Sequence, residues 1–324
     1  MSEFDCAVIV PAFNAAAFLG ETLDALVGQT VPARKVIVVD DGSTDATPAI
    51  VDSYGPRVEL LQQANSGQGV ARALGIADCD TQWIALCDAD DVWEAEHLSR
   101  RHALLQAFPD AEFTMSDCCS FGAQAGSSIG VIDAAPSSWI QDWGSPVDDE
   151  VFWLDDPMAA TLVYNPFYPS GLVFSRESYE RMGGFLPRYS RWRAEDMEFT
   201  RRYFARGEVK ALCDLRKTWR YRRHDGNYSS KQWLNLLARA KILEEHESQG
   251  LVPDRLRKAT EREIGSARAA AFDIAYWDGD FAVARDLYRR ELPDSERSPK
   301  RRLRMLHAWF AALGKGRVNL AVSP

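Results

Sequence analysis

The sequence predicts an α/β protein whose mostly parallel sheet is flanked by helices and followed by a helical C-terminal region. Three observations lead to this prediction. Short apolar runs alternate with segments of helical spacing over residues 7–87, as in β-α-β units. Polar clusters directly follow the apolar runs, as ligand-binding loops follow parallel strands. From Ser230 onward, apolar residues recur only at helical spacing.

The N-terminal part is predicted to contain four pairs of strand and helix. The expected strands are 7–11, 35–40, 58–62 and 83–87. The expected helices are 15–29, one capped by Thr44 or Asp45, 68–77, and one that begins near Glu94. Parallel strands of such units end at one edge of the sheet, so the polar clusters are expected to meet there. These clusters are 11–14, 40–43, 65–67 and 88–91.

The fourth apolar run ends in three acids, Asp88, Asp90 and Asp91. Alternate side chains of an extended chain share a face, so Asp88 and Asp90 are expected to project together. Mg²⁺ or Mn²⁺ would relieve their repulsion, because these cations take oxygen ligands and keep one or two protein carboxylates. The alternative is a solvated acidic turn that caps the helix near Glu94.

Two common nucleotide-binding motifs are absent from the sequence. The first strand-to-helix turn, residues 11–16, contains no glycine, which disfavours a dinucleotide-dependent oxidoreductase. Gly67 and Gly69 lack the third glycine of that fingerprint. No P-loop sequence occurs either, so a P-loop phosphate site is also disfavoured.

Composition narrows the class of protein further. The net charge of -9 disfavours nonspecific nucleic-acid binding. The six cysteines form no CxxC pair, which predicts reduced thiols in a cytoplasmic protein. The N-terminus lacks the features of a secretory signal. No apolar stretch approaches the roughly 18 residues that span a bilayer.

Four motifs together carry a specific resemblance. They are Val-Ile-Val-Pro-Ala-Phe-Asn (8–14), Val-Val-Asp-Asp-Gly-Ser-Thr-Asp (38–45), Asn-Ser-Gly-Gln-Gly-Val-Ala-Arg-Ala-Leu-Gly (65–75) and Asp-Ala-Asp-Asp (88–91). In this order and spacing they resemble a family 2 glycosyltransferase of the Rossmann-like GT-A fold, over roughly residues 6–225. The resemblance implies a nucleotide-sugar donor, a divalent metal and inversion at the anomeric carbon.

The resemblance also implies a set of donor-binding residues. Pro11, Phe13 and Asp41 would contact the nucleoside, and Arg72 would lie near the base or the phosphates. The Phe13 ring could stack on a base, or it could belong to the core. Arg72 could also be a solvated helix residue. The family often has Tyr where Phe13 stands and Asn where Ala73 stands, which leaves individual hydrogen bonds open.

By the same resemblance, Asp88 and Asp90 would hold the ribose and the metal. The segment 220–229, Arg-Tyr-Arg-Arg-His-Asp-Gly-Asn-Tyr-Ser, resembles the one that closes the catalytic domain in many relatives. There a histidine can complete the metal site, so His224 is the candidate, although it could be purely structural. Arg222 and Arg223 could bind phosphate.

Two acids, Glu195 and Asp196, open a predicted helix. They could merely complement the helix dipole. Transfer to an acceptor hydroxyl, however, needs a carboxylate within reach of its proton. The pair matches the Glu-Asp pair of the family, which implies that Asp196 is the general base and that Glu195 orients it or the acceptor.

Three regions are predicted. Residues 1–115 would bind the nucleotide sugar, residues 116–228 would bind the acceptor and carry catalysis, and residues 229–324 would be helical. The stretch 116–165 has few periodic runs and is expected to form irregular loops, with most of its aromatic side chains in the core. A strand over 169–175 and a helix over 177–182 are expected to follow it.

The C-terminal residues carry basic side chains and no acid from Arg297 to Arg317. A helix there would place five apolar side chains on one face, namely Leu303, Leu306, Trp309, Phe310 and Leu313. Such a helix could lie on an anionic membrane surface, which would suit a lipid-linked acceptor. Equally, it could pack against the protein or a second subunit.

The sequence thus predicts a cytoplasmic, metal-dependent, inverting glycosyltransferase that moves one sugar to a glycan or lipid-linked acceptor. The alternative is a noncatalytic carbohydrate-binding or scaffold protein on a degenerate GT-A fold. A nucleotidyltransferase would need a glycine-rich Gly-x-Gly-x-Arg loop after the first strand, and none is present. The absence of Gln-x-x-Arg-Trp after the acidic pair disfavours a processive synthase.

Overall fold

A computed structural model describes residues 4–123, 125, 130–192, 194–205, 209–224, 231–313 and 320. The chain divides into two compact units. The first unit comprises residues 1–191 and 199–225, and the second comprises residues 192–198 and 226–324.

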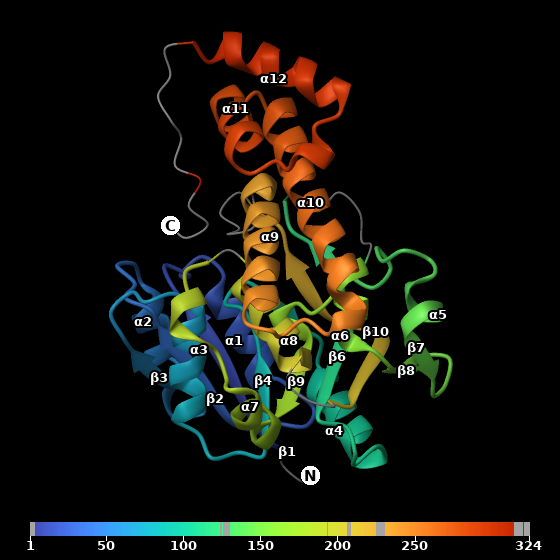
Figure 1. The fold of residues 1–324 in the computed structure, drawn as a ribbon. Helices are drawn as coiled ribbons and strands as arrows, with labels where there is room; N and C mark the ends of the chain where they lie inside the picture. The colour runs from blue at the N-terminus through green and yellow to red at the C-terminus, as the bar shows by residue number, and fades with distance from the viewer. Residues whose placement is uncertain are drawn as a thin grey trace. The chain divides into compact units, whose positions relative to one another are not determined.

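The first unit is built on one sheet of ten strands in the order β3-β2-β1-β4-β9-β6-β10-β8-β7, with β5 paired to β10 (Figure 1). The strands are β1 Phe4–Ala12, β2 Ala33–Asp40, β3 Glu59–Gln62, β4 Trp83–Leu86, β5 Val92–Trp93, β6 Phe113–Phe121, β7 Gly144–Pro146, β8 Val151–Leu154, β9 Leu172–Ser175 and β10 Ala211–Arg222.

Seven of these strands run in the same direction. One of them is β7, which is antiparallel to β8, and β8 is itself antiparallel to β10. β1 to β4 pair in parallel, and β6 pairs in parallel with β10. β9 lies between β4 and β6 and is antiparallel to both, so β6 and β10 point the same way as β4. The carboxyl ends of these strands therefore lie at one edge of the sheet, where ligands of such sheets bind.

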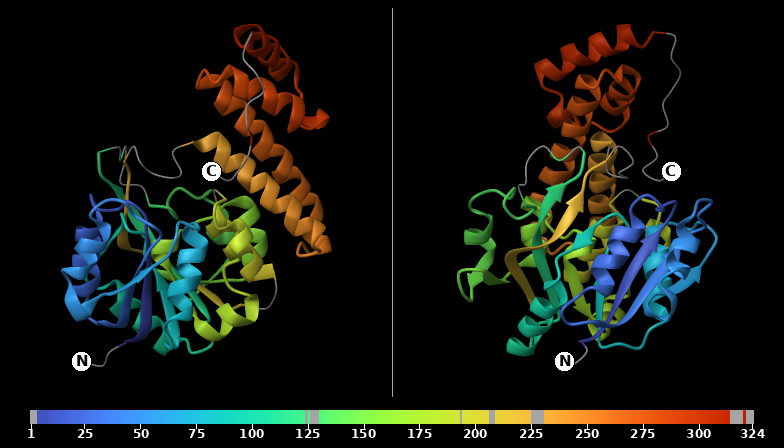
Figure 2. Two further views of the ribbon diagram at one scale, coloured as in Figure 1. Left: turned by 90° about the vertical axis from the view of Figure 1, so that its left-hand side faces the viewer. Right: turned by 180° about the vertical axis from the view of Figure 1, so that it is seen from behind.

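Helices cover both faces of the sheet (Figure 2). In the first unit they are α1 Leu19–Val27, α2 Thr47–Asp52, α3 Gln68–Ala77, α4 His97–Ala107, α5 Trp139–Trp143, α6 Pro157–Val163, α7 Arg176–Met182 and α8 Glu195–Ala205, whose first turn belongs to the second unit. Short 3-10 helices are η1 Gly55–Arg57, η2 Pro169–Gly171 and η3 Pro187–Tyr189.

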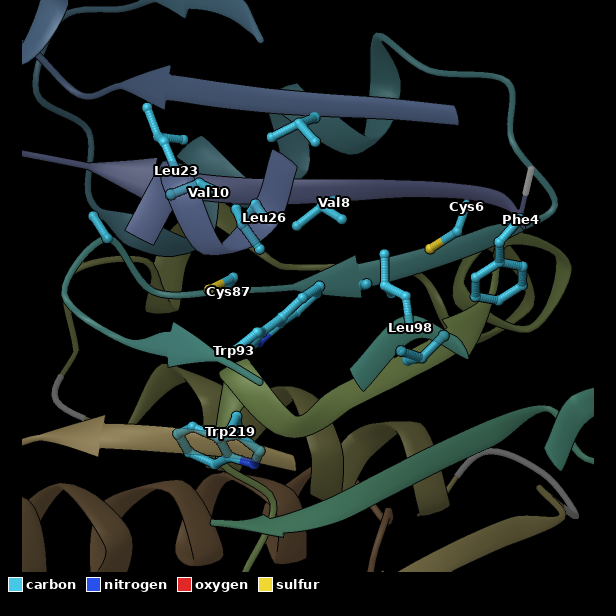
Figure 3. Close-up of a cluster of buried hydrophobic side chains, with 14 of the residues drawn as sticks. Phe4, Cys6, Val8, Val10, Leu23, Leu26, Cys87, Trp93, Leu98 and Trp219 are labelled. Atoms are coloured by element: carbon cyan, nitrogen blue, oxygen red, sulfur yellow. The ribbon is translucent and has the colours of Figure 1, made fainter. Parts of the chain in front are cut away.

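The side chains of β1 alternate between the two faces of the sheet, and each face packs against a different helix. Val8 and Val10 share a buried cluster with Leu23 of α1 (Figure 3). Ile9, on the other face, has its side chain against Gly75 of α3, where an added Cβ would lie 2.8 Å from it. Successive side chains of a strand point to opposite faces, so each apolar residue of β1 contributes to a core.

The predicted fold class is confirmed, but three local predictions are wrong. Residues 116–165 contain most of β6 together with α5, β7, β8 and α6, because β10, which was not predicted, pairs with β6 and β8. α2 begins at Thr47 without a side-chain cap, and neither Thr44 nor Asp45 is its N-cap. α4 begins at His97 rather than near Glu94, because β5 intervenes.

Other local predictions are confirmed. α3 has the predicted bounds. Trp139, Phe152 and Phe167 are buried, as expected for most aromatic residues of their region. All six cysteines are free thiols.

The described part of the second unit consists of helices and the loops that connect them. Its helices are α9 Gln232–Ser248, α10 Asp254–Trp277, α11 Phe281–Arg290, η5 Asp294–Glu296 and α12 Pro299–Ala311. Its core includes Leu237, Phe272 and Leu287, which come from the first three of these helices. Within the described residues, every helix is too short or too polar to cross a bilayer.

Candidate active site

The loop after β1 is tied to the loop after β2. Pro11 is buried within β1, whereas Phe13, just beyond the strand, is 51% exposed. The Phe13 ring therefore lies outside the core. Asn14 has a φ of 48°, a conformation that Asn tolerates better than most residues. Its backbone N–H donates to Ser43 Oγ (2.8 Å), and its side-chain oxygen accepts from Thr44 N–H (2.9 Å).

Asp41 organises the loop that follows β3. Its Oδ1 accepts hydrogen bonds from Ser66 N–H and Gln63 Nε2, both at 2.7 Å, and its Oδ2 accepts from Gly67 N–H at 2.8 Å. The carboxylate is only 4% exposed. This geometry gives Asp41 a role in shaping the loop, while its contact with a nucleoside stays a prediction.

The N-terminus of α3 is occupied by a serine from a distant segment. Ser190 Oγ accepts a hydrogen bond from Val70 N–H at 2.7 Å. A Cβ added at Gly67 would lie 2.5 Å from the Ser190 carbonyl oxygen, and one at Gly69 would lie 3.2 Å from the Ser190 Cα. Gly67 also has a φ of +92°. Both glycines therefore serve the approach of Ser190, which the sequence did not reveal.

Arg72 and Asp88 form an ion pair at the carboxyl edge. Arg72 is 1% exposed, and its Nη2 lies 2.8 Å from Asp88 Oδ1. The guanidinium also lies over the Phe185 ring, 5.7 Å from its centroid. Arg72 is thus a buried residue rather than a solvated one. Its positive charge lies next to the loop that follows β4.

The structure brings Asp90 and His224 together from the ends of β4 and β10. His224 Nε2 lies 3.0 Å from Asp90 Oδ2. The His224 ring packs on Phe18, with 4.5 Å between centroids. Arg222 fixes the loop, because its Nε donates to the Asp90 carbonyl oxygen at 2.7 Å. The Arg222 guanidinium also pairs with Glu21 at 2.6 Å. It is therefore held by protein groups.

Asp91 is buried, unlike the partly exposed Asp88 and Asp90. Its Oδ2 accepts from Ser170 Oγ at 2.5 Å, and its Oδ1 accepts from Arg222 N–H at 3.0 Å. Asp88 N–H donates to the same Ser170 hydroxyl at 3.0 Å. Ser170 thus connects η2 to the acidic loop. The sequence assigned it only to a strand, since its partners lie about 80 residues away.

The acids sit in an environment that suits a cation. Burial and the neighbouring Asp88 carboxylate raise the pKa of Asp90, although His224 opposes this shift. Carboxylate oxygens and imidazole nitrogen are ligands that Mn²⁺ accepts. The described residues contain no group of three or more His, Cys, Asp or Glu side chains arranged around one metal position. Mg²⁺ sites commonly keep only one or two protein carboxylates, so the carboxylates of Asp88 and Asp90 suit such an ion by their chemistry, although they do not form a three-ligand group with His224.

The predicted catalytic pair lies in the second unit, whereas the donor residues lie in the first. Glu195 is buried, and Asp196 Oδ1 accepts a hydrogen bond from Met197 N–H at 2.7 Å. Ala194, just before the pair, has a φ of 76°, which strains a residue with a Cβ. In the part of the chain that the structure covers, Ala194 and Asn14 are the two non-glycine residues with positive φ.

Part of the predicted closing segment lies outside the described residues. Arg223 and His224 are described, whereas residues 225–230 are not. Arg193, which precedes the acidic pair, and Lys315 and Arg317 of the basic tail also lie outside the described residues.

Comparison with known proteins identifies similar sequences. Residues 7–116 match the model of the family "Glycosyl transferase family 2". A protein of Escherichia coli K12, named as an uncharacterized glycosyltransferase, YibD, is 40% identical over 87 residues, which are 26% of this chain and 25% of that protein. Bacillus subtilis TuaG, provisionally named a teichuronic acid biosynthesis glycosyltransferase, is 30% identical over 146 residues, 42% of this chain and 54% of that protein. The chain thus spans about half or less of the curated relatives it matches.

Solved structures are similar over nearly the whole chain. Staphylococcus aureus TarS 1–349 in complex with UDP-GlcNAc has a TM-score of 0.62 at 16% identity, covering 94% of this chain and 89% of that one. The mannosyltransferase PcManGT from Pyrobaculum calidifontis, in complex with GDP-Man and Mn²⁺, has a TM-score of 0.55 at 20% identity, covering 96% and 86%. The chain therefore has the GT-A fold of these enzymes.

Proposed function

We propose that this chain is a metal-dependent, inverting glycosyltransferase that moves one sugar from a nucleotide-sugar donor to an acceptor hydroxyl. The main support is the arrangement at the carboxyl edge of the sheet. There the pair of Arg72 and Asp88 adjoins the pair of Asp90 and His224. Buried charge and repelling carboxylates at such an edge are typical of functional sites.

The donor is a nucleoside diphosphate sugar. Two observations support this class. The Phe13 ring is exposed beside β1, where a base could stack on it. The structurally similar TarS and PcManGT were solved with UDP-GlcNAc and GDP-Man. Pro11 and Asp41 would shape the nucleoside position, and Arg72 would place positive charge beside it.

Asp90 and His224, with Asp88, would hold Mn²⁺ or Mg²⁺. The bound ion would supply positive charge that stabilises the departing diphosphate. The chain itself contributes the geometry of these ligands. The ring of Phe18 supports His224, and the side chain of Arg222 holds the backbone of Asp90.

The transfer is a single displacement. The acceptor oxygen forms a bond to the anomeric carbon while the bond from that carbon to the diphosphate oxygen breaks, which inverts the configuration. Asp196 takes the proton of the acceptor hydroxyl as general base, and Glu195 orients it. The products are the glycoside and the nucleoside diphosphate. The acceptor is a hydroxyl of a surface glycan or of a lipid-linked precursor.

A thermal-shift panel of sugar nucleotides, with and without Mn²⁺, tests the donor assignment. A ligand at about 100 times its Kd adds roughly 2.7 kcal/mol to the free energy of unfolding. We expect one nucleotide class to raise the melting temperature more when Mn²⁺ is present. Asp90→Ala should remove this metal-dependent part. Asp80→Ala, which changes an exposed acid of the same kind, should keep it. No shift with a broad panel would favour the scaffold alternative.

A second variant tests the base. Asp196→Asn should lower the release of nucleoside diphosphate by about 100-fold or more, as loss of a general base does, and should leave donor binding intact. Asp254→Asn is the control, because Asp254 is also an acid in the first turn of a helix, although it is exposed whereas Asp196 is half-buried. A near-normal rate for Asp196→Asn would remove that residue from the role.

A further inference from the structure

The last helix presents an exposed apolar face. The described residues contain nine exposed large hydrophobic side chains, and five of these lie on α12 or just after it. We call these five the α12 apolar face: Leu303, Leu306, Trp309, Phe310 and Leu313, which are 41% to 69% exposed. Monomeric proteins rarely expose apolar side chains in such a cluster unless a partner covers them.

The spacing places these side chains together. Leu303, Leu306 and Phe310 follow each other at intervals of three and four residues, and Trp309 lies one turn after Leu306. Residues three and four apart are neighbours on a helix surface. The α12 apolar face is therefore one continuous stripe along the helix.

The opposite side of α12 is already fixed within the second unit. Ala308 is fully buried, and Met305 packs against the core of the unit. Arg301 and Arg304 both pair with Asp273 of α10, at 2.9 and 2.6 Å. These contacts fix the orientation of the helix. The α12 apolar face therefore points away from the core of the unit and stays exposed.

Positive charge accompanies the apolar face. Lys300 and Arg302 are exposed and lie three residues before Leu303 and four residues before Leu306, respectively, so they adjoin the α12 apolar face. No Asp or Glu occurs from Arg297 to the last residue, although the whole chain carries a net charge of -9. This segment is therefore positively charged, whereas the chain as a whole is negatively charged.

We infer that the α12 apolar face binds an anionic lipid surface. A helix with apolar side chains on one face and cations beside them lies in the plane of a membrane, with its apolar side in the acyl boundary. Trp309 suits the interface, because its ring is apolar and its N–H is polar. Each nearby cation adds attraction to anionic headgroups. Donor binding is not required for this interaction.

Charge also argues for lipid over a second copy of the chain. A symmetric dimer through this face would bring together two surfaces that each carry Lys300 and Arg302. Neither surface offers a carboxylate from α12 to pair with them. An anionic bilayer provides the missing charge and covers the apolar side chains at the same time.

Vesicle sedimentation with the full chain tests this inference. The vesicles are phosphatidylcholine alone or phosphatidylcholine mixed with phosphatidylglycerol. We expect the partition coefficient on the mixed vesicles to be about 10-fold higher or more, and to fall as salt is raised. Equal partition on both vesicles, or none on either, would overturn the inference.

Two double variants separate the apolar and the electrostatic parts. Leu306→Asp with Phe310→Asp, and Lys300→Glu with Arg302→Glu, should each lower binding to mixed vesicles by about 10-fold or more. Binding unchanged in both would contradict the inference. Loss only in the second would assign the binding to charge alone and overturn the role of the apolar face.

The controls change residues of the same kind elsewhere. Val163→Asp alters another exposed apolar side chain. Arg255→Glu with Lys258→Glu makes the same change in net charge on exposed positions of α10. All controls should keep vesicle binding, and all variants should keep the donor-dependent thermal shift. Self-association that the α12 variants abolish, without any vesicle binding, would instead identify a second copy as the occupant.

Discussion

At the scale of single residues, Arg72 shows how one side chain connects the core to the candidate site. A guanidinium that is 1% exposed needs an anionic partner, and Asp88 supplies it. The Asp88 side chain is itself 28% exposed. The pair therefore joins a buried guanidinium to a carboxylate that is partly open to solvent at the edge of the sheet. Phe185 adds a ring face beneath the guanidinium.

Replacing Arg72 should therefore affect both stability and donor binding. Arg72→Met leaves Asp88 without its buried partner, and we expect a loss of about 1–3 kcal/mol in the free energy of unfolding, since water compensates part of the cost. Arg34→Met breaks an exposed pair with Asp80 and should cost less than about 1 kcal/mol. Urea unfolding measures both, and equal losses would contradict the account.

At the scale of elements, the start of α3 depends on a segment from another part of the chain. The η3 loop delivers Ser190 to the first turn of α3, and Arg191 Nη2 bonds to the Asn65 carbonyl oxygen. The loop that Asp41 organises is thus held from two sides. It precedes the helix that carries Arg72, so its shape determines where that helix begins.

Two glycine variants test this coupling. Gly67→Ala places a Cβ 2.5 Å from the Ser190 carbonyl oxygen at a φ of +92°, so we expect a loss of about 2 kcal/mol or more and weaker donor binding. Gly20→Ala, in α1, meets no atom within 4 Å and should add up to about 1 kcal/mol. Denaturant unfolding and the donor thermal shift provide the readouts. A tolerated Gly67→Ala would show that the loop moves without cost.

At the scale of the whole molecule, stability should depend on the protonation of His97. This residue is fully buried, its Nδ1 lies 2.8 Å from Thr218 Oγ1, and its ring stacks on Trp93. Burial and the charge of Arg101 lower the pKa of His97 well below its usual value. The folded chain thus keeps His97 neutral, while the unfolded chain binds a proton below about pH 6.5.

The free energy of unfolding should accordingly fall as pH decreases from about 6.5, by up to about 1.4 kcal/mol per pH unit from this group. His97→Asn retains a nitrogen near Thr218 and should flatten this dependence between about pH 6.5 and 5. His307→Asn changes an exposed histidine and should leave it unaltered. Urea titrations across this range provide the test, and parallel curves for His97→Asn and the unmodified chain would contradict it.

Sequence patterns located the elements whose signal is local. β1, β2 and β4 contain continuous apolar runs, β3 has the apolar pair Leu60 and Leu61, and α3 has clear periodicity, so their positions were predictable. β10 was missed because charged residues such as Arg216 and Lys217 interrupt its apolar ones, and its pairing with β6 and β8 is visible only in three dimensions. The contacts of Ser170 and Ser190 depend on partners far along the chain. For the same reason the sequence did not reveal them.

The place of β10 in the sheet also bears on how the protein is made. A growing chain emerges from the ribosome N-terminus first, so β1 to β4 and their acids are available long before residues 211–222 are synthesised. Until then β6 and β8 have open edges, which invite pairing with other chains. Arg222 and His224 reach Asp90 only when this strand inserts. A nascent chain that ends before His224 therefore lacks the contacts that complete the candidate site.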